Sequence, residues 1–108
     1  MNTRKYSKEQ ENRIAKKLGG KVVSNSGATR FNKGDVVVNK VLIECKTSTT
    51  SKDSFSIKLD WLEKNQKEAF SMGLDASILT IDFGQEKDYF IINEKLMKLL
   101  LEKLKEEK

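Results

Sequence analysis

The chain has 108 residues, with 21 lysines and arginines, 16 acidic residues, one cysteine and no histidine. One cysteine excludes an internal disulfide and suits a reducing compartment, and the lack of histidine excludes Ser/His and Cys/His nucleophiles and nearly all zinc chemistry. Because no apolar run is long enough to span a bilayer and none follows the basic N-terminus, the sequence predicts a single cytoplasmic domain over residues 1–108, with no membrane partner.

Charge is unevenly distributed along the chain. Residues 1–58 hold 13 basic and 5 acidic side chains, a net of +8, whereas residues 59–108 hold 8 and 11, a net of −3. This asymmetry predicts one polyanion-binding region. From charge alone, a solvated basic face with no partner is an equally good interpretation.

The first predicted element is a helix. Ser7 followed by Gln10 has the form of a capping box, so the helix is expected to begin at Ser7 and to end at Gly19-Gly20. Glu11 lies on the apolar stripe of this helix, which predicts that its carboxylate reaches the sheet; the alternative is that it only stabilises the first turn. The other members of the stripe are Ile14, Ala15 and Leu18.

Strands are predicted next. Residues 21–24 form a short strand, and the polar residues 25–34 form a loop. Residues 35–38 and 41–46 are rich in β-branched side chains and are separated by only two residues, which predicts a β-hairpin.

The second half of the chain alternates in the same way. Residues 47–54 predict a hydroxyl-rich loop, and Asp60 with Glu63 has the form of a second capping box, opening a helix that runs to Gly73. Residues 77–83 and 88–92 predict two more strands.

A last helix is expected from a cap at Asn93 to about residue 105, with its apolar stripe packed on the sheet and dimer contact as the alternative. The stripe comprises Leu96, Met97, Leu100, Leu101 and Leu104. The element order predicts a mixed sheet with helices against it, in the α/β or α+β class.

Charged residues interrupt the two central strands. Because side chains alternate along a strand, Glu44 and Lys46 share one face, and Asp35 opens the neighbouring strand of the hairpin. Two carboxylates so close repel each other unless a divalent cation lies between them, and carboxylate oxygens favour Mg²⁺ or Mn²⁺. Lys46 is then placed to act on an attacking water or on the transition state. The alternative is a structural pair of Glu44 and Lys46 on a half-exposed edge strand.

These residues resemble the PD-(D/E)XK nuclease superfamily, and most closely the small Holliday-junction resolvases of phage and archaeal type. The resemblance covers residues 7 to 83, with glycine in place of proline before Asp35. It rests on Glu11 in the first helix and on the stretches Ser26-Gly27-Ala28, Lys33-Gly34-Asp35-Val36, Ile43-Glu44-Cys45-Lys46-Thr47 and Trp61-Leu62-Glu63-Lys64 with Glu68-Ala69 beyond.

The resemblance implies a restriction-endonuclease-like αβββαβ core with an extra strand and a C-terminal helix. It also implies Mg²⁺ (with Mn²⁺ as a substitute) held by Asp35, Glu44 and the main-chain carbonyl of Cys45, with Glu11 completing the shell and Lys46 serving the water. A homodimer acting on branched DNA is a further implication. The thiol of Cys45 itself is expected to be buried on the opposite face.

Further DNA contacts are expected on loops and on the second helix, where phosphates can be held without reading bases. The same residues are otherwise simply solvated, and Trp61 is expected in the core. By resemblance Ser26 lies near the scissile phosphate. The candidate contacts are Ser26, Arg30, Lys33, Thr47, Ser48 and Lys64.

The function expected from all of this is a magnesium-dependent DNA endonuclease, foremost a Holliday-junction resolvase. One alternative is a homing, restriction-like or repair nuclease with the same chemistry, although the small size favours recognition of DNA shape over sequence. Another is a non-catalytic DNA-binding module, in which the carboxylates would not bind a cation.

Overall fold

The structure, a computed structural model, describes residues 3–23 and 35–106. It contains one five-stranded sheet, with the strands side by side in chain order, and three helices. The elements are α1 (Thr3–Leu18), β1 (Lys21–Val22), β2 (Asp35–Val38), β3 (Val41–Thr47), α2 (Leu59–Ser71), β4 (Ala76–Asp82), β5 (Asp88–Ile91) and α3 (Glu94–Glu106).

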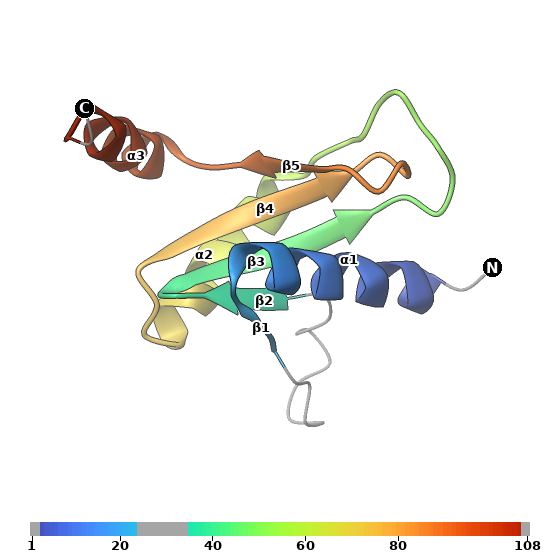
Figure 1. The fold of residues 1–108 in the computed structure, drawn as a ribbon, viewed down its shortest axis with the longest axis horizontal. Helices are drawn as coiled ribbons and strands as arrows, with labels where there is room; N and C mark the ends of the chain where they lie inside the picture. Colours follow the sequence, from blue (N-terminus) through green and yellow to red (C-terminus); the bar gives the residue numbers. More distant parts are fainter. Residues whose placement is uncertain (1–2, 24–34, 107–108) are drawn as a thin grey trace.

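The sheet is mixed. Strands β3 and β4 are parallel and joined through α2, whereas the other neighbouring pairs are antiparallel. Helix α1 packs on the first three strands and α2 on β3 and β4, and Figure 1 shows the two helices on opposite faces of the sheet. The predicted element order and the mixed α/β class are therefore confirmed.

The core on the α1 face is built by branched side chains. Ile14 of α1 packs against Val36, Ile43 and Cys45, all of them buried. This places the Cys45 side chain in the core, as predicted, and burial raises the pKa of its thiol above the ordinary value. The next residues along β3, Glu44 and Lys46, must then point to the α2 face, because side chains alternate along a strand.

The first helix ends where predicted but begins earlier. It runs from Thr3, so Ser7 lies inside it and the predicted capping box is wrong. Gly19 ends the helix with a positive φ of 76°. A Cβ atom on Gly20 would overlap the side chain of Val38, so the backbone at Gly20 lies closer to β2 than any residue with a side chain would allow.

The second predicted capping box is wrong as well. The residue before α2 is Lys58, and no side chain caps the helix there. Asp60 lies within the first turn, where its Oδ2 is 3.2 Å from Nζ of Lys64. At α3 the prediction is confirmed, because the amide of Leu96 donates to Oδ1 of Asn93 at 2.9 Å.

The predicted packing of α3 against the sheet is wrong. Its apolar stripe was expected against the sheet, but no residue of α3 is buried by the described part of the chain. Figure 1 shows the helix beyond the end of β5, away from the two sheet faces that α1 and α2 cover. None of the three described helices combines the length and the apolar character needed to cross a bilayer.

Candidate active site

The β2–β3 hairpin sets two carboxylates side by side. Val38 pairs with Val41 across a two-residue turn, in which Asn39 has a φ of 55°. This register places Asp35 directly opposite Glu44. Directly opposed residues of an antiparallel pair project to the same face, with Cβ atoms about 5 Å apart. The hairpin prediction is confirmed, and the two acidic side chains share the face toward α2.

Lys46 lies between an acid and an aromatic ring. Its Nζ is 3.0 Å from Oε2 of Glu44 and 4.3 Å from the ring centroid of Trp61, which belongs to α2. The Nζ of Lys58 lies 6.0 Å from the same ring. A cation over an indole face is stabilised by the ring quadrupole. Trp61 is half-buried and is not among the buried core residues, so the prediction that it lies in the core is wrong.

Asp35 is the most strongly perturbed carboxyl of the site. Its residue is only 2% exposed, and burial together with the charges of Glu68, Glu44 and Glu11 raises its pKa from 3.8 to about 8, against an opposing effect of Lys46. Burial disfavours the charged form, and neighbouring carboxylates disfavour it further. A divalent cation bound here would remove both penalties, because it supplies the positive charge that the cluster lacks.

Glu68 belongs to the resemblance described above, but no role in the site was predicted for it. Among the neighbouring charges, it has the largest influence on the pKa of Asp35, and its own pKa is raised by burial and by Glu44. Trp61, Asn65 and Glu68 are spaced at i, i+4 and i+7, so they lie on one face of α2. Trp61 contacts Lys46, and Asn65 donates to the carbonyl of Ile78 on β4 at 3.1 Å. This helical spacing is the sequence pattern from which a place for Glu68 on the same face as Trp61 could have been predicted.

Glu11 approaches from the other helix. It is 9% exposed, and its charge raises the pKa values of both Asp35 and Cys45. Burial raises the pKa of Glu11 itself, and Lys8 opposes this. Glu11 is thus within electrostatic reach of the cluster, from the helix that packs on the Cys45 face.

A polar network fixes the end of β3. Gln10, which is fully buried, donates from Nε2 to the carbonyl of Lys46 at 3.0 Å and to Asp88 at 3.3 Å. Arg13 donates to Asp88 through two nitrogens and to Asp82 at 3.0 Å. Hydrogen bonds to Asp88 raise the pKa of Arg13 further, so this cation is held inside the fold. No local pattern in the sequence predicts this network.

Some hydroxyl groups of the loop after Lys46 form hydrogen bonds within the loop. Ser48 is buried; its Oγ bonds to the carbonyl of Thr50 at 2.5 Å and accepts from the Thr50 amide at 3.2 Å. Thr47 donates to the Ser48 carbonyl at 3.3 Å. Ser48 therefore stabilises the loop, and its contact with DNA stays a prediction.

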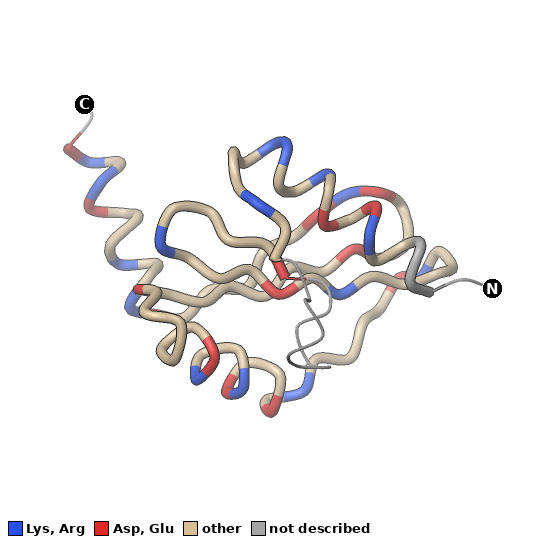
Figure 2. The backbone as a smooth tube through the Cα atoms, turned by 90° about the horizontal axis from the view of Figure 1, so that it is seen from below, with Lys and Arg blue, Asp and Glu red and all other residues tan. Residues whose placement is uncertain are grey.

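The other predicted DNA contacts lie either outside the described residues or on α2. Ser26, Arg30 and Lys33 lie outside the described residues. Lys64 is exposed on α2 and paired with Asp60. Figure 2 shows basic and acidic positions interspersed along the outer elements, so surface charge alone does not single out one polyanion-binding face in the part of the chain described.

The donor set suits a hard cation. Asp35 and Glu44 offer carboxylate oxygens, the ligands that Mg²⁺ and Mn²⁺ prefer. Within residues 3–23 and 35–106 no three acidic or thiol side chains stand together in a geometry that could hold a metal ion. The set implied by the resemblance is Asp35, Glu44, the main-chain carbonyl of Cys45 and Glu11. The structure sets Asp35 and Glu44 directly opposite each other, whereas Glu11 belongs to the helix that packs on the Cys45 face.

Comparison of the chain with protein-family models, with curated proteins and with solved structures gives no match. The arrangement of side chains therefore carries the functional argument.

Proposed function

We propose that this chain is a divalent-cation-dependent DNA endonuclease of the PD-(D/E)XK type, acting preferentially on branched DNA such as a four-way junction. The observation that carries the proposal is the direct opposition of Asp35 and Glu44 on the β2–β3 hairpin, with Lys46 on the same face. Burial and the charges of three other carboxylates raise the pKa of Asp35 to about 8, and such perturbed groups mark functional sites.

Each residue has a distinct part in the proposed reaction. Asp35, Glu44 and the carbonyl of Cys45 would hold Mg²⁺, which when bound would lower the pKa of a water and neutralise charge on the phosphodiester. Lys46 would orient the attacking water and stabilise the additional negative charge as the water oxygen bonds to phosphorus and the bridging P–O bond breaks. Glu11 and Glu68 would add negative charge that strengthens cation binding.

Lys46 must change partner for this role. Its Nζ is paired with Oε2 of Glu44, and a metal ion held by Glu44 would compete for that oxygen. Trp61 offers the ammonium a second contact, with the ring centroid 4.3 Å from Nζ, and a metal ion held by the carboxylates would leave this contact in place. We therefore assign Trp61 the role of a positioning residue for Lys46.

Replacing Trp61 with leucine should lower the rate of DNA cleavage by roughly 2- to 30-fold, since an exposed or partly desolvated cation–π contact contributes about 0.5–2 kcal/mol. Phenylalanine retains a ring face and should lose less. Single-turnover rates and Mg²⁺ titrations of both variants test this. A fall in the rate with an unchanged cation affinity is expected, whereas equal rates for Trp61→Leu and the native chain would exclude the assigned role.

The proposed substrate class is tested with a panel of labelled DNAs. The native chain with Mg²⁺ should cut a four-way junction faster than nicked, flapped or linear duplex of the same sequence, and EDTA should stop the reaction. Preference for another member of the panel would retain the chemistry and overturn the resolvase assignment. Cleavage of none of them, with either Mg²⁺ or Mn²⁺, would overturn the nuclease proposal.

A further inference from the structure

A cavity lies at the end of the sheet where β3 and β4 stop. It has a volume of about 240 Å³ and is formed by the loop after β3 and by the turn between β4 and β5. Figure 1 shows these two connections at the same end of the sheet. Cavities for drug-sized ligands have volumes of about 300–1,000 Å³, so this one suits a single ring system. The side chains that line it are Lys52, Asp53, Phe83, Gln85, Lys87 and Tyr89.

The loop and the turn that form the cavity are held against each other. The amide of Lys52 donates to the carbonyl of Phe83 at 2.9 Å. A Cβ atom on Gly84 would overlap the main-chain carbonyl of Thr50, so the two backbones are in close contact there. Within the turn, Oδ1 of Asp82 accepts hydrogen bonds from three successive amides at 2.9 to 3.1 Å. The cavity is therefore preorganised, which lowers the entropic cost of binding a ligand.

Tyr89 shares its face of the sheet with Lys46. The register pairs Lys46 with Ile81 of β4 and Ile81 with Tyr89 of β5, so the three residues form one row across the sheet. Residues in such a row project to the same face, here the face toward α2. Neighbouring strands lie about 4.8 Å apart, which places the backbone of Tyr89 about 10 Å from that of Lys46. This separation corresponds to about three stacked nucleotides, because each adds about 3.4 Å along a strand.

The cavity has an exposed aromatic surface. Phe55, Phe83 and Tyr89 pack edge to face in a row, with ring centroids 6.0 and 5.8 Å apart. This packing supports the ring of Tyr89, although the residue is 56% exposed. An exposed aromatic ring is a surface on which a nucleobase can stack, and because every base has a π-face the interaction accepts any of them.

Two lysines line the cavity together with the aromatic rings. Lys52 and Lys87 are exposed, and within residues 3–23 and 35–106 neither forms an ion pair. Their ammonium groups are suited to phosphate oxygens. Asp53 would repel a phosphate inside the cavity, whereas its carboxylate can accept a hydrogen bond from the amino group of a base. The charges therefore favour a base inside the cavity and phosphates at the two lysines.

We propose that this cavity binds an unpaired nucleotide of DNA, with its base stacked on Tyr89 and the neighbouring phosphates at Lys52 and Lys87. The choice of DNA as the polymer rests on the proposed function, whereas the stacking surface and the lysines do not depend on it. Taking a base out of a duplex costs free energy, and the cost is least where the base is mispaired or already single-stranded. The cavity would thus favour branched or frayed DNA over continuous duplex.

The test is the binding of fluorescently labelled DNA, followed by anisotropy in EDTA so that cleavage cannot occur. Tyr89→Leu should weaken binding of a single strand of about eight nucleotides by roughly 5- to 150-fold, the range for loss of one base–aromatic stack. Binding of the blunt duplex of the same sequence should be unchanged. Tyr89→Phe retains the ring and should bind the single strand as the native chain does.

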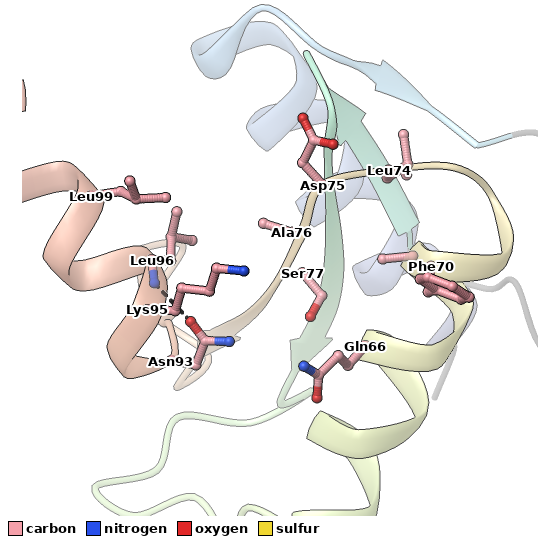
Figure 3. Close-up of a pocket in the computed structure, with 11 residues that line it drawn as sticks. Gln66, Phe70, Leu74, Asp75, Ala76, Ser77, Asn93, Lys95, Leu96 and Leu99 are labelled. Carbon is pink, nitrogen blue, oxygen red and sulfur yellow. Dashed lines mark hydrogen bonds between the residues drawn. The ribbon is translucent and has the colours of Figure 1, made fainter.

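Phe70→Leu is the matched control for Tyr89→Leu. Phe70 is another exposed aromatic residue (85%), and Figure 3 shows it at a separate cavity between α2 and α3. Its replacement should leave binding of the single strand unchanged. Lys52→Ala and Lys87→Ala test the phosphate contacts, because each should reduce by about 0.7 the steepness with which the logarithm of the association constant falls against the logarithm of salt concentration.

Equal binding of the single strand by the native chain and by a folded Tyr89→Leu would overturn the proposal. If circular dichroism shows that Tyr89→Leu is unfolded, the lysine variants decide, and unchanged salt slopes in both overturn it. Deoxyguanosine monophosphate bound as tightly as the strand also overturns it, since the cavity would then be a site for a free nucleotide. Failure of the proposed function is distinct, because a chain that does not cut DNA with Mg²⁺ should still show Tyr89-dependent binding in EDTA.

Discussion

Replacing Asp35 with asparagine is expected to abolish Mg²⁺-dependent cleavage and, at the same time, to stabilise the cation-free protein at alkaline pH. The first effect follows from the loss of a charged ligand oxygen and should lower Mg²⁺ affinity by at least about 100-fold. The second follows from the raised pKa of Asp35, about 8. Removing the buried charge should increase the free energy of unfolding by several kcal/mol at pH 9 in EDTA, because each unit of pKa shift corresponds to about 1.4 kcal/mol.

The protein in EDTA should lose stability as the pH rises from 4 to 8. Because the folded-state pKa of Asp35 lies above its ordinary value of 3.8, the stability associated with the neutral carboxyl is fully present below pH 4 and is lost as the pH rises to 8. Urea unfolding of the native chain and of Asp35→Asn should therefore agree at pH 4 and diverge at pH 9. Asp53→Asn, at an exposed loop position, is the matched control. A less stable Asp35→Asn at pH 9 would contradict this account.

Replacing Lys46 with alanine is expected to reduce the cleavage rate by about 10²- to 10⁴-fold, the range for loss of a group that acts on the reacting atoms. Cation affinity should be unchanged or slightly higher, because the ion pair between Lys46 and Glu44 at 3.0 Å no longer competes. Junction binding in Ca²⁺ should persist. The measurements are single-turnover cleavage, calorimetric titration with Mg²⁺ and a gel-shift assay.

Lys40→Ala is the control for Lys46→Ala. Lys40 is an exposed lysine at the turn of the same hairpin, so its removal changes the net charge equally and leaves the cluster intact. It should cleave at the native rate. If both variants lost activity to the same degree, net charge rather than the position of Lys46 would explain the loss.

The sequence correctly predicted those parts of the fold that depend on interactions between residues close together in the chain. The two-residue connection between strands fixed the hairpin register, and with it the opposition of Asp35 and Glu44. The cap at Asn93 was equally local. The two predicted capping boxes are wrong because each helix begins before the residue that was expected to cap it. The helix that contains Ser7 begins at Thr3, and the helix that contains Asp60 begins one residue earlier, at Leu59.

Tertiary contacts explain what the sequence did not predict. Glu68 and Trp61 reach the site only because α2 packs on the face of the sheet that carries Glu44 and Lys46. The spacing of residues within α2 does not indicate which strands the helix covers. The apolar stripe of α3 has the pattern of a helix that packs on a sheet. A periodic stripe specifies that a partner is needed, but it does not say whether the partner belongs to the same chain.

The most direct test of the central claim is calorimetric titration of the protein with Mg²⁺ at pH 7, in two buffers that differ in ionisation enthalpy. Since Asp35 is predominantly protonated at pH 7 in the cation-free protein, binding should release a proton, and the apparent enthalpy should differ between the buffers. Asp35→Asn and Glu44→Gln should each lose this binding. Absence of binding in the native chain, or identical binding in both variants, would contradict a cation held between Asp35 and Glu44.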